Sequence, residues 1–254
     1  MLRLSGKVAF ITGGGTGIGR ACALAFGREG AQVAIAGRRR EPLEAVAREI
    51  EARGGAALAL TCDVTKTEAV MEALSQSERH FGRLNTIVNN AGAVVVATAE
   101  NTSDEDWEKV IAVNLTGTFL VSRGALPALR RAGGGSIVNI GSVLGLVARK
   151  ERAAYCAAKA GVSGLTRAMA IDHAPDKIRV NCICPTIVET ELGMLSIRKA
   201  ADAESEIQRR INEIPLGRMG TPEDVAMMAV YLASDEASWV TGASFPLDGG
   251  VTAY

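Results

Sequence analysis

The chain has 254 residues, 48% of them hydrophobic, and its 28 Lys and Arg equal its 28 Asp and Glu in number. A formal net charge of zero excludes the long-range attraction that brings basic proteins to nucleic acid or to an anionic membrane. The two histidines, His80 and His173, have no acidic cluster near them in the sequence, so we expect no metal site. This length predicts one large domain, 1–254, with an ample core.

Short apolar runs alternate with longer helical patterns along the chain. Apolar residues that follow one another without alternation indicate strands buried on both faces, and strand–helix alternation indicates a parallel sheet. We therefore predict an α/β, seven-stranded, doubly wound parallel sheet of the Rossmann type, with helices on both faces and a ligand crevice beyond the carboxyl ends of the strands. We expect strands at 8–11, 32–36, 56–61, 86–89, 136–140, 179–184 and 244–247, and helices at 17–29, 41–53, 66–81, 103–131, 153–173 and 221–232.

The first expected strand leads directly into a glycine-rich turn and then a helix. Five of the seven residues from Gly13 to Gly19 are glycine. Such a turn lets backbone N–H groups approach a diphosphate at the start of a helix, where negative charge is favoured. We expect Gly13, Gly14, Gly15, Gly17 and Gly19, and also Gly37 and Gly92, to leave volume for a dinucleotide, with Thr16 and Ile18 beside it.

The second expected strand ends in Gly37-Arg38-Arg39, without the acidic residue that binds the ribose 2′-hydroxyl of NAD. Glycine leaves room for a 2′-phosphate, and an arginine can bind one through two hydrogen bonds. We predict that NADP(H) is preferred and that NAD(H) is possible. The alternative is that Arg38 and Arg39 only begin a solvated helix.

The third and fourth strands end in small or polar residues. Asp63, after the third, either accepts a hydrogen bond from the adenine amino group or caps the next helix, and both interpretations stay open. Asn89-Asn90-Ala91-Gly92, after the fourth, permits close approach of the backbone to the cofactor.

Tyr155 and Lys159 are four residues apart in an expected helix and therefore share one face. A nearby ammonium lowers a tyrosine pKa from about 10, which would make Tyr155 a general acid or base. The spacing alone is common. Ser142, at the end of the fifth strand, and Asn114, within an apolar stretch, strengthen this interpretation because a buried amide needs polar partners.

These motifs resemble the short-chain dehydrogenase/reductase family over essentially the whole chain, and among its members the 3-oxoacyl-[acyl-carrier-protein] reductases and the sugar and polyol dehydrogenases. The resemblance implies that Tyr155 exchanges a proton with the substrate oxygen during hydride transfer, that Lys159 binds the nicotinamide ribose and lowers the pKa of Tyr155, and that Ser142 binds the carbonyl. Asn114 would hold a water that connects Lys159 to solvent. The matches are Thr12–Gly19 (TGxxxGIG), Asn89–Gly92 (NNAG), Asn114, Ser142 and Tyr155 with Lys159 (YxxxK).

The resemblance also implies the remaining cofactor contacts. Asp63 and Val64 would meet the adenine; Pro185, Ile187 and Thr190 would meet the carboxamide; and Asn90, Ala91 and Gly92 would lie beside the adjacent ribose. The family usually has Pro-Gly after the sixth strand, whereas this chain has Pro185-Thr186, and threonine restricts the backbone where glycine would not.

We expect an oxidoreductase that acts on a secondary alcohol or ketone, with a 3-oxoacyl thioester favoured and a sugar, polyol or sugar acid as the alternative. The apolar loop 93–98 disfavours a bare polyol. A dinucleotide-binding regulator without turnover is less expected, because it gains nothing from a tuned phenol. A carrier-protein partner would need a basic patch, but we interpret its candidates as solvated charge: Arg123, Arg130, Arg131, Arg149, Lys150 and Arg152.

Segment 191–214 interrupts the alternation, and we expect either a substrate-side helical lid or a plain surface helix pair. Five cysteines without a C-x-x-C pair, no signal-peptide core and no run of about 18 apolar residues predict a cytoplasmic protein. The family resemblance implies a homotetramer built on helices 103–131 and 153–173 and the C-terminal strand. The expected partner is a small-molecule substrate, with no nucleic acid and no membrane.

Overall fold

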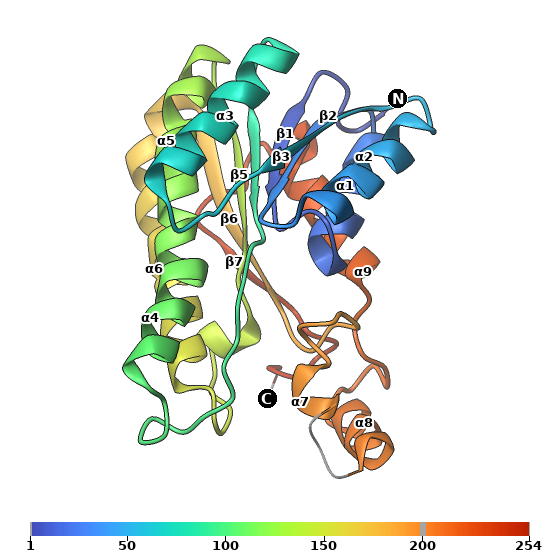
Figure 1. Ribbon diagram of the computed structural model, residues 1–254, viewed down its shortest axis with the longest axis vertical. Helices are drawn as coiled ribbons and strands as arrows, with labels where there is room; N and C mark the ends of the chain where they lie inside the picture. The colour runs from blue at the N-terminus through green and yellow to red at the C-terminus, as the bar shows by residue number, and fades with distance from the viewer. Residues whose placement is uncertain (1, 199–201, 254) are drawn as a thin grey trace.

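A computed structural model describes residues 2–198 and 202–253. Seven parallel strands form one sheet in the order β3-β2-β1-β4-β5-β6-β7, which confirms the predicted fold class (Figure 1). The chain starts in the middle of the sheet, builds one half, and then returns past β1 to build the other. The strands are β1 (Val8–Thr12), β2 (Gln32–Gly37), β3 (Ala56–Thr61), β4 (Thr86–Asn89), β5 (Gly135–Ile140), β6 (Ile178–Pro185) and β7 (Ser244–Leu247).

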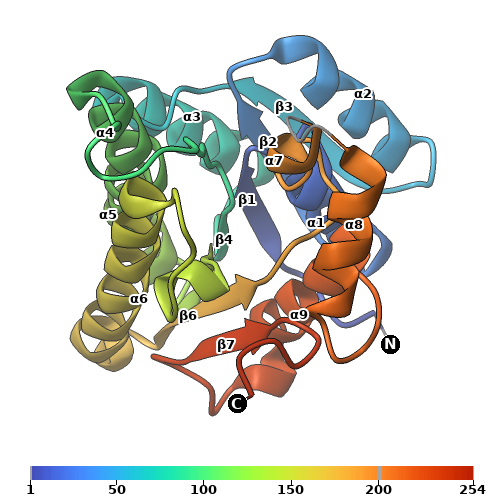
Figure 2. The ribbon, with the colours of Figure 1, turned by 90° about the horizontal axis from the view of Figure 1, so that it is seen from below.

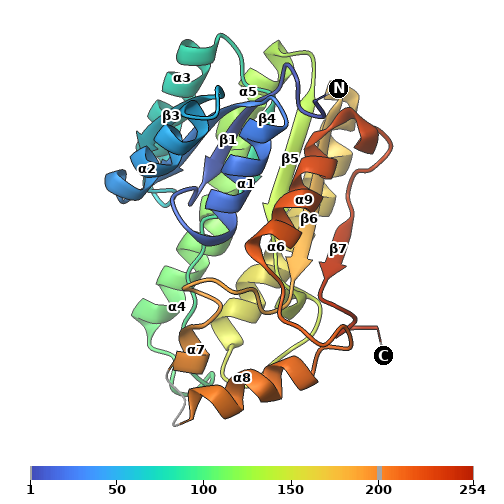
Figure 3. The ribbon, with the colours of Figure 1, turned by 90° about the vertical axis from the view of Figure 1, so that its right-hand side faces the viewer.

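Helices cover both faces of this sheet. One layer holds α1, α2 and α9, and the opposite layer holds α3, α5 and α6, with α4 extending below it (Figures 1 and 3). The helix bounds are α1 (Gly17–Arg28), α2 (Arg40–Glu51), α3 (Thr67–Phe81), α4 (Asp104–Ile111), α5 (Gly117–Arg131), α6 (Ala153–His173), α7 (Leu195–Arg198), α8 (Ala203–Asn212) and α9 (Pro222–Ala233).

The central strand β1 is apolar up to its last residue because helices cover both of its faces. Ala9 and Ile11 pack into the hydrophobic cluster under α1 and α9, whereas Val8 and Phe10 pack into the cluster under α3 and α5. Successive side chains of a strand point to opposite faces, so helices on both sides bury every residue.

The expected single helix 103–131 is interrupted, which corrects the prediction. α4 passes into a π-helical turn, Ala112–Thr116, before α5 begins. Asn114 lies inside that turn, and its Nδ2 donates to the carbonyls of Val110 and Ala93, at 2.8 Å each. The wider turn brings the amide against the loop after β4, and π turns of this kind occur often at functional sites.

Segment Asp104–Arg131 has the length and composition of a membrane span, with a mean hydropathy of 1.2 in its most apolar window. Its helices pack along α3 and α6 as part of the helical layer of this domain.

The loop after β6 carries α7 and α8, which lie across the carboxyl ends of the strands (Figures 1 and 2). This is the position predicted for the lid segment 191–214, of which residues 199–201 lie outside the described residues. That the segment opens and closes stays a prediction.

Candidate active site

Two adjoining cavities lie beyond the carboxyl ends of the strands. One, of about 410 Å³, is bordered by the glycine loop and the ends of β2 and β3. The other, of about 280 Å³, is bordered by the end of β5, the start of α6 and the loop after β6. They share the lining residues Ile18, Asn90, Gly92, Thr190, Leu192 and Leu195, so they form one continuous cleft.

The structure places most predicted cofactor residues in this cleft. Pro185 and Ile187 line its smaller cavity, together with the predicted catalytic side chains, whereas Gly15 and Gly19 line neither cavity. Those at the larger cavity are Gly13, Thr16, Gly17, Ile18, Arg38, Arg39, Asp63, Val64, Asn90, Ala91, Gly92 and Thr190.

Neighbouring protein atoms explain why several positions near the expected dinucleotide are glycine. A Cβ on Gly14 would lie 2.3 Å from the Ile35 side chain, and one on Gly19 would lie 2.2 Å from the Gly13 carbonyl oxygen. Gly13 and Gly17 have φ values of +64° and +52°, which glycine adopts most readily. The prediction that ligand volume demands Gly14 and Gly19 is therefore wrong: the protein itself fills that space.

Asn90 fastens the glycine loop to the end of β4. Its Nδ2 donates to the carbonyls of Thr12 at 2.9 Å and Gly13 at 3.2 Å. The backbone N–H groups of Asn90 and Ala91 both donate to the Thr12 hydroxyl oxygen at 3.0 Å. The loop is therefore held in shape by side chains as well as by its own backbone.

The start of α1 fits an anionic group. Thr16 is the residue before the helix, and its side chain makes no capping hydrogen bond, while the first turn contains no acidic residue. Backbone N–H groups of this first turn therefore have no capping side chain within the described chain. A diphosphate is the ligand that such a helix start accommodates best.

The opposite end of the larger cavity carries Arg38 and Arg39, both exposed. Asp63 faces them, and its Oδ1 accepts hydrogen bonds from the backbone N–H and the hydroxyl of Thr65, at 3.0 and 2.8 Å. Burial favours a higher pKa for Asp63, but the Thr65 bonds and the charge of Arg38 together lower it. Lys66 precedes α3, so the alternative in which Asp63 caps that helix is wrong.

Ser142 and Tyr155 both line the smaller cavity. The Ser142 Oγ donates to the Pro185 carbonyl at 3.4 Å and accepts the Leu144 N–H at 3.1 Å. Burial raises the pKa of Tyr155 to about 12, although the Ser142 hydroxyl opposes this shift. The structure thus shows the opposite direction from the predicted lowering.

Lys159 explains this difference. Its Nζ donates to the Ile140 carbonyl at 2.7 Å and lies 5.7 Å from the centre of the Tyr155 ring. Burial lowers the pKa of Lys159 to about 8, so the side chain is still mostly charged at pH 7 and loses its proton just above that pH. The ammonium is therefore directed at β5 and contributes little to the phenol. Its predicted contact with the nicotinamide ribose stays a prediction.

Asn114 is fully buried, and its side-chain bonds go to the backbones of Ala93 and Val110. The amide thus joins the loop after β4 to the π-helical turn. The water that the family resemblance places at Asn114 stays a prediction.

Two glycines after β5 that allow close packing at the site were not anticipated. A Cβ on Gly145 would lie 2.7 Å from the Lys159 carbonyl, and one on Gly141 would lie 2.5 Å from the Cys182 sulfur. The turn after β5 can therefore lie directly on α6 at Gly145 and on β6 at Gly141. The signal available in the sequence was the abundance of glycine, 28 of 254 residues or roughly 11%, against about 7% in an average protein.

Three arginines also line the smaller cavity: Arg149, Arg152 and Arg210. Arg152 is only 9% exposed, which corrects our interpretation of it as solvated charge. Arg210, in α8, was not singled out from the sequence. Glu206 lies four residues before Arg210, and oppositely charged residues at this spacing are typical of an exposed helix surface.

Known proteins share both the sequence and the fold. Residues 13–252 match a family model described as enoyl-(acyl carrier protein) reductase. A crystal structure of a short-chain type dehydrogenase/reductase from Mycobacterium marinum superposes with a TM-score of 0.91, at 38% identity, over 100% of this chain and 98% of that chain.

Curated relatives act on several substrates. A 2-(S)-hydroxypropyl-CoM dehydrogenase of Xanthobacter autotrophicus is 43% identical over 99% of this chain and 98% of its own. A D-threitol dehydrogenase of Mycolicibacterium smegmatis is 40% identical over 98% and 94%, and a 3-oxoacyl-[acyl-carrier-protein] reductase of Thermotoga maritima is 38% identical over 98% and 99%.

The cleft has a helix start without a capping side chain at one end, and a serine and a tyrosine at the other. The match of family, relatives and fold extends over nearly the whole chain. The chain therefore belongs to the short-chain dehydrogenase/reductase family and is an oxidoreductase of alcohols and ketones that uses a nicotinamide dinucleotide.

Proposed function

We propose that the protein interconverts a secondary alcohol and a ketone with NADP(H) as the preferred cofactor. The observation that carries this proposal is the meeting of Ser142 and Tyr155 in a cavity that continues into the dinucleotide-sized cavity. The bound nicotinamide supplies or accepts the hydride. The protein residues supply the proton and the orientation.

In the reducing direction, the Ser142 hydroxyl donates a hydrogen bond to the carbonyl oxygen and orients it. The Tyr155 hydroxyl then donates its proton to the same oxygen as negative charge develops there. A pKa of about 12 suits Tyr155 to hold this proton until the alkoxide forms. In the oxidising direction the proton returns to the phenolate oxygen.

Replacing Tyr155 with phenylalanine tests this role. General acid–base catalysis contributes roughly 10²- to 10⁴-fold, so we expect Tyr155→Phe to lose activity by at least about 10²-fold while it binds NADPH as tightly as the wild type. Nicotinamide absorbance measures the first quantity and fluorescence titration the second. Full activity in the variant would refute the mechanism. A wild type that binds NADPH and turns over no alcohol or ketone would favour the regulator instead.

The cofactor preference depends on Arg38 and Arg39 at the mouth of the larger cavity. A charge-assisted hydrogen bond contributes about 1.5–3 kcal/mol, so we expect Arg38→Ala to weaken NADPH about tenfold or more and NADH little. Arg40→Ala is the matched control, because Arg40 pairs with Glu44 at 2.6 Å and does not line the cavity. Equal affinities of the wild type for NADH and NADPH would overturn the preference.

We propose that the substrate presents an apolar chain next to its carbonyl, as a 3-oxoacyl thioester does. Val94, Val96, Leu144, Val147 and Leu192 line the smaller cavity, and a polyol would leave its hydroxyls against them without partners. The alternative is a polyol, in the manner of the threitol-oxidising relative. A coupled screen with 3-oxoacyl thioesters, polyols and keto-sugars distinguishes the two, and a kcat/KM that is highest for a polyol would refute our choice. We further propose a cytoplasmic location and a homotetramer.

A further inference from the structure

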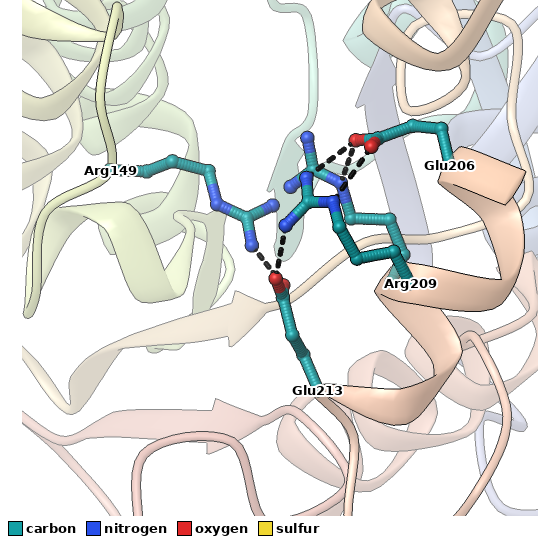
Figure 4. A network of polar contacts seen from close by, with 5 residues as sticks. Arg149, Glu206, Arg209 and Glu213 are labelled. Atoms are coloured by element: carbon teal, nitrogen blue, oxygen red, sulfur yellow. Dashed lines mark hydrogen bonds and ion pairs between the residues drawn. The ribbon is translucent and has the colours of Figure 1, made fainter. Parts of the chain in front are cut away.

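The smaller cavity contains more positive charge than the proposed reaction needs. Arg149, Arg152 and Arg210 line it, and its described lining includes no Asp or Glu. Arg149 and Arg152 come from the loop before α6, and Arg210 comes from α8. Figure 4 shows Arg149 reaching toward Glu213 from the side opposite this helix. Guanidinium groups from two separate elements therefore meet at one cavity.

Arg152 is the strongest indication of a ligand. It is 9% exposed, and its Nη1 donates to the Glu151 carbonyl at 2.9 Å. No carboxylate within the described residues forms an ion pair with it. A guanidinium has five N–H donors, and a buried charge without a counterion is costly. Burial and the neighbouring charge of Arg149 lower the pKa of Arg152, and the charge of Glu151 opposes this shift without reversing it.

The carboxylates nearby are too few to neutralise the arginines. Glu206 accepts from Arg210 at 2.6 Å, and Glu213 pairs with Arg149. Arg209 also forms ion pairs with both of these carboxylates, as Figure 4 shows. Two carboxylates thus serve the three arginines of this network, and Arg152 stands outside it. The region has an excess of positive charge that faces a mostly apolar cavity.

Arg152 lines the same cavity as Ser142 and Tyr155, and its charge lowers the pKa of Tyr155, which burial raises overall. A substrate whose carbonyl rests on Ser142 and Tyr155 would therefore extend its other end along the apolar wall toward Arg152 and Arg210. This geometry matches a small molecule with a carbonyl at one end and a negative charge at the other. Arg210 is 7% exposed, so α8 contributes a fixed and desolvated donor.

We propose that the substrate ends in an anionic group with several oxygen atoms, such as a carboxylate, a sulfonate or a phosphate. Arg152 and Arg210 bind this group. The carbonyl end of this assignment rests on the proposed function. Arg149, half-exposed and paired with Glu213, lines the same cavity. Arg152 and Arg210 are accordingly residues that determine specificity.

A matched pair of ketones tests the preference. We expect kcat/KM with NADPH to be at least about tenfold higher for 5-oxohexanoate than for its neutral methyl ester. Arg152→Gln and Arg210→Gln should each reduce this ratio toward one, mainly through KM, and Arg152→Lys should retain part of it. The control Arg83→Gln should leave both rates unchanged, since Arg83 is exposed and precedes the amino end of β4, whereas the cavity lies beyond the carboxyl ends of the strands.

A binding measurement separates this proposal from the proposed reaction. We expect calorimetry to detect 1-butanesulfonate binding to the wild type and to Tyr155→Phe, and a loss of about tenfold or more in Arg152→Gln. Such binding supports the anion subsite even if neither ketone is reduced, a result that would count against the reaction alone. If the ester is used as well as the acid and Arg152→Gln leaves binding unchanged, the anion subsite is overturned while the reaction stands.

Discussion

Lys159 shows how burial changes the chemistry of a single residue. The side chain is 4% exposed, and its pKa falls to about 8 from an ordinary value of 10.5 because burial disfavours the ammonium. Between these two values the unfolded chain holds a proton that the folded chain has released. Stability attributable to Lys159 must therefore rise with pH in this window.

We expect the free energy of unfolding of the wild type, relative to Lys159→Met, to increase by about 2 kcal/mol between pH 7 and pH 9.5. The buried charge destabilises the folded state most at the lower pH, and its loss relieves that penalty. Urea denaturation of both proteins at several pH values measures this difference. A difference that stays constant over the range would show that Lys159 keeps its charge.

The meeting of Ser142, Tyr155 and Lys159 at one cavity was predictable, because each belongs to a recognisable motif, whereas their catalytic roles stay predictions. Their protonation was not predictable, since it depends on burial and on where Nζ of Lys159 points. Arg152 was misinterpreted for a related reason: a short run of basic residues in a loop has the same sequence pattern whether a side chain is solvated or buried.

At the scale of elements, the π-helical turn depends on one amide. Asn114 satisfies two carbonyls from different segments, and both would lose this donor in Asn114→Ala. A buried polar group left without a partner costs about 1–3 kcal/mol, and we expect a loss of stability in that range. Urea denaturation measures it. Glu100→Ala is a useful control because Glu100 is an exposed residue of the preceding loop, and a loss in Asn114→Ala no larger than in this control would contradict the expectation.

The strands were predictable to within a residue or two at their ends because each is a continuous apolar run between turn residues. The interruption of helix 103–131 was not predictable, since a π-helical turn of five residues changes the spacing of apolar residues too little to be distinguished from an α-helix in the sequence. The unusual Asn114 in this stretch was noticed, but its effect on helix geometry depends on the position of Ala93, which only the folded chain supplies.

At the scale of the whole molecule, the regions proposed for assembly each carry an exposed large apolar side chain. Phe119 lies on α5, Ile171 on α6 and Trp239 just before β7, and Trp239 is 99% exposed. We expect light scattering to give about four times the chain mass of 26.5 kDa. Apolar groups this exposed favour burial against another copy.

Trp239→Glu should reduce this mass to that of a smaller species, because it would bury a charge at the contact. Met71→Glu is the control, since Met71 is also exposed but lies on α3, outside the proposed contacts. A monomeric wild type, or a tetramer unaffected by Trp239→Glu, would contradict the proposed assembly.

The π-helical turn also lets this helix hold one extra residue without turning α4 relative to α5. Each residue of an α-helix advances the side-chain direction by about 100°, so one extra residue in a regular helix would rotate α4 relative to α6 by roughly this angle. A π turn closes its hydrogen bonds one residue further along the chain and absorbs that residue within a single turn. Deleting one residue within 112–116 would therefore restore a regular α-helix and keep α4 against α6, while Asn114 would lose its contact with Ala93. The packing of the helix tolerates this change, and its connection to the loop after β4 does not.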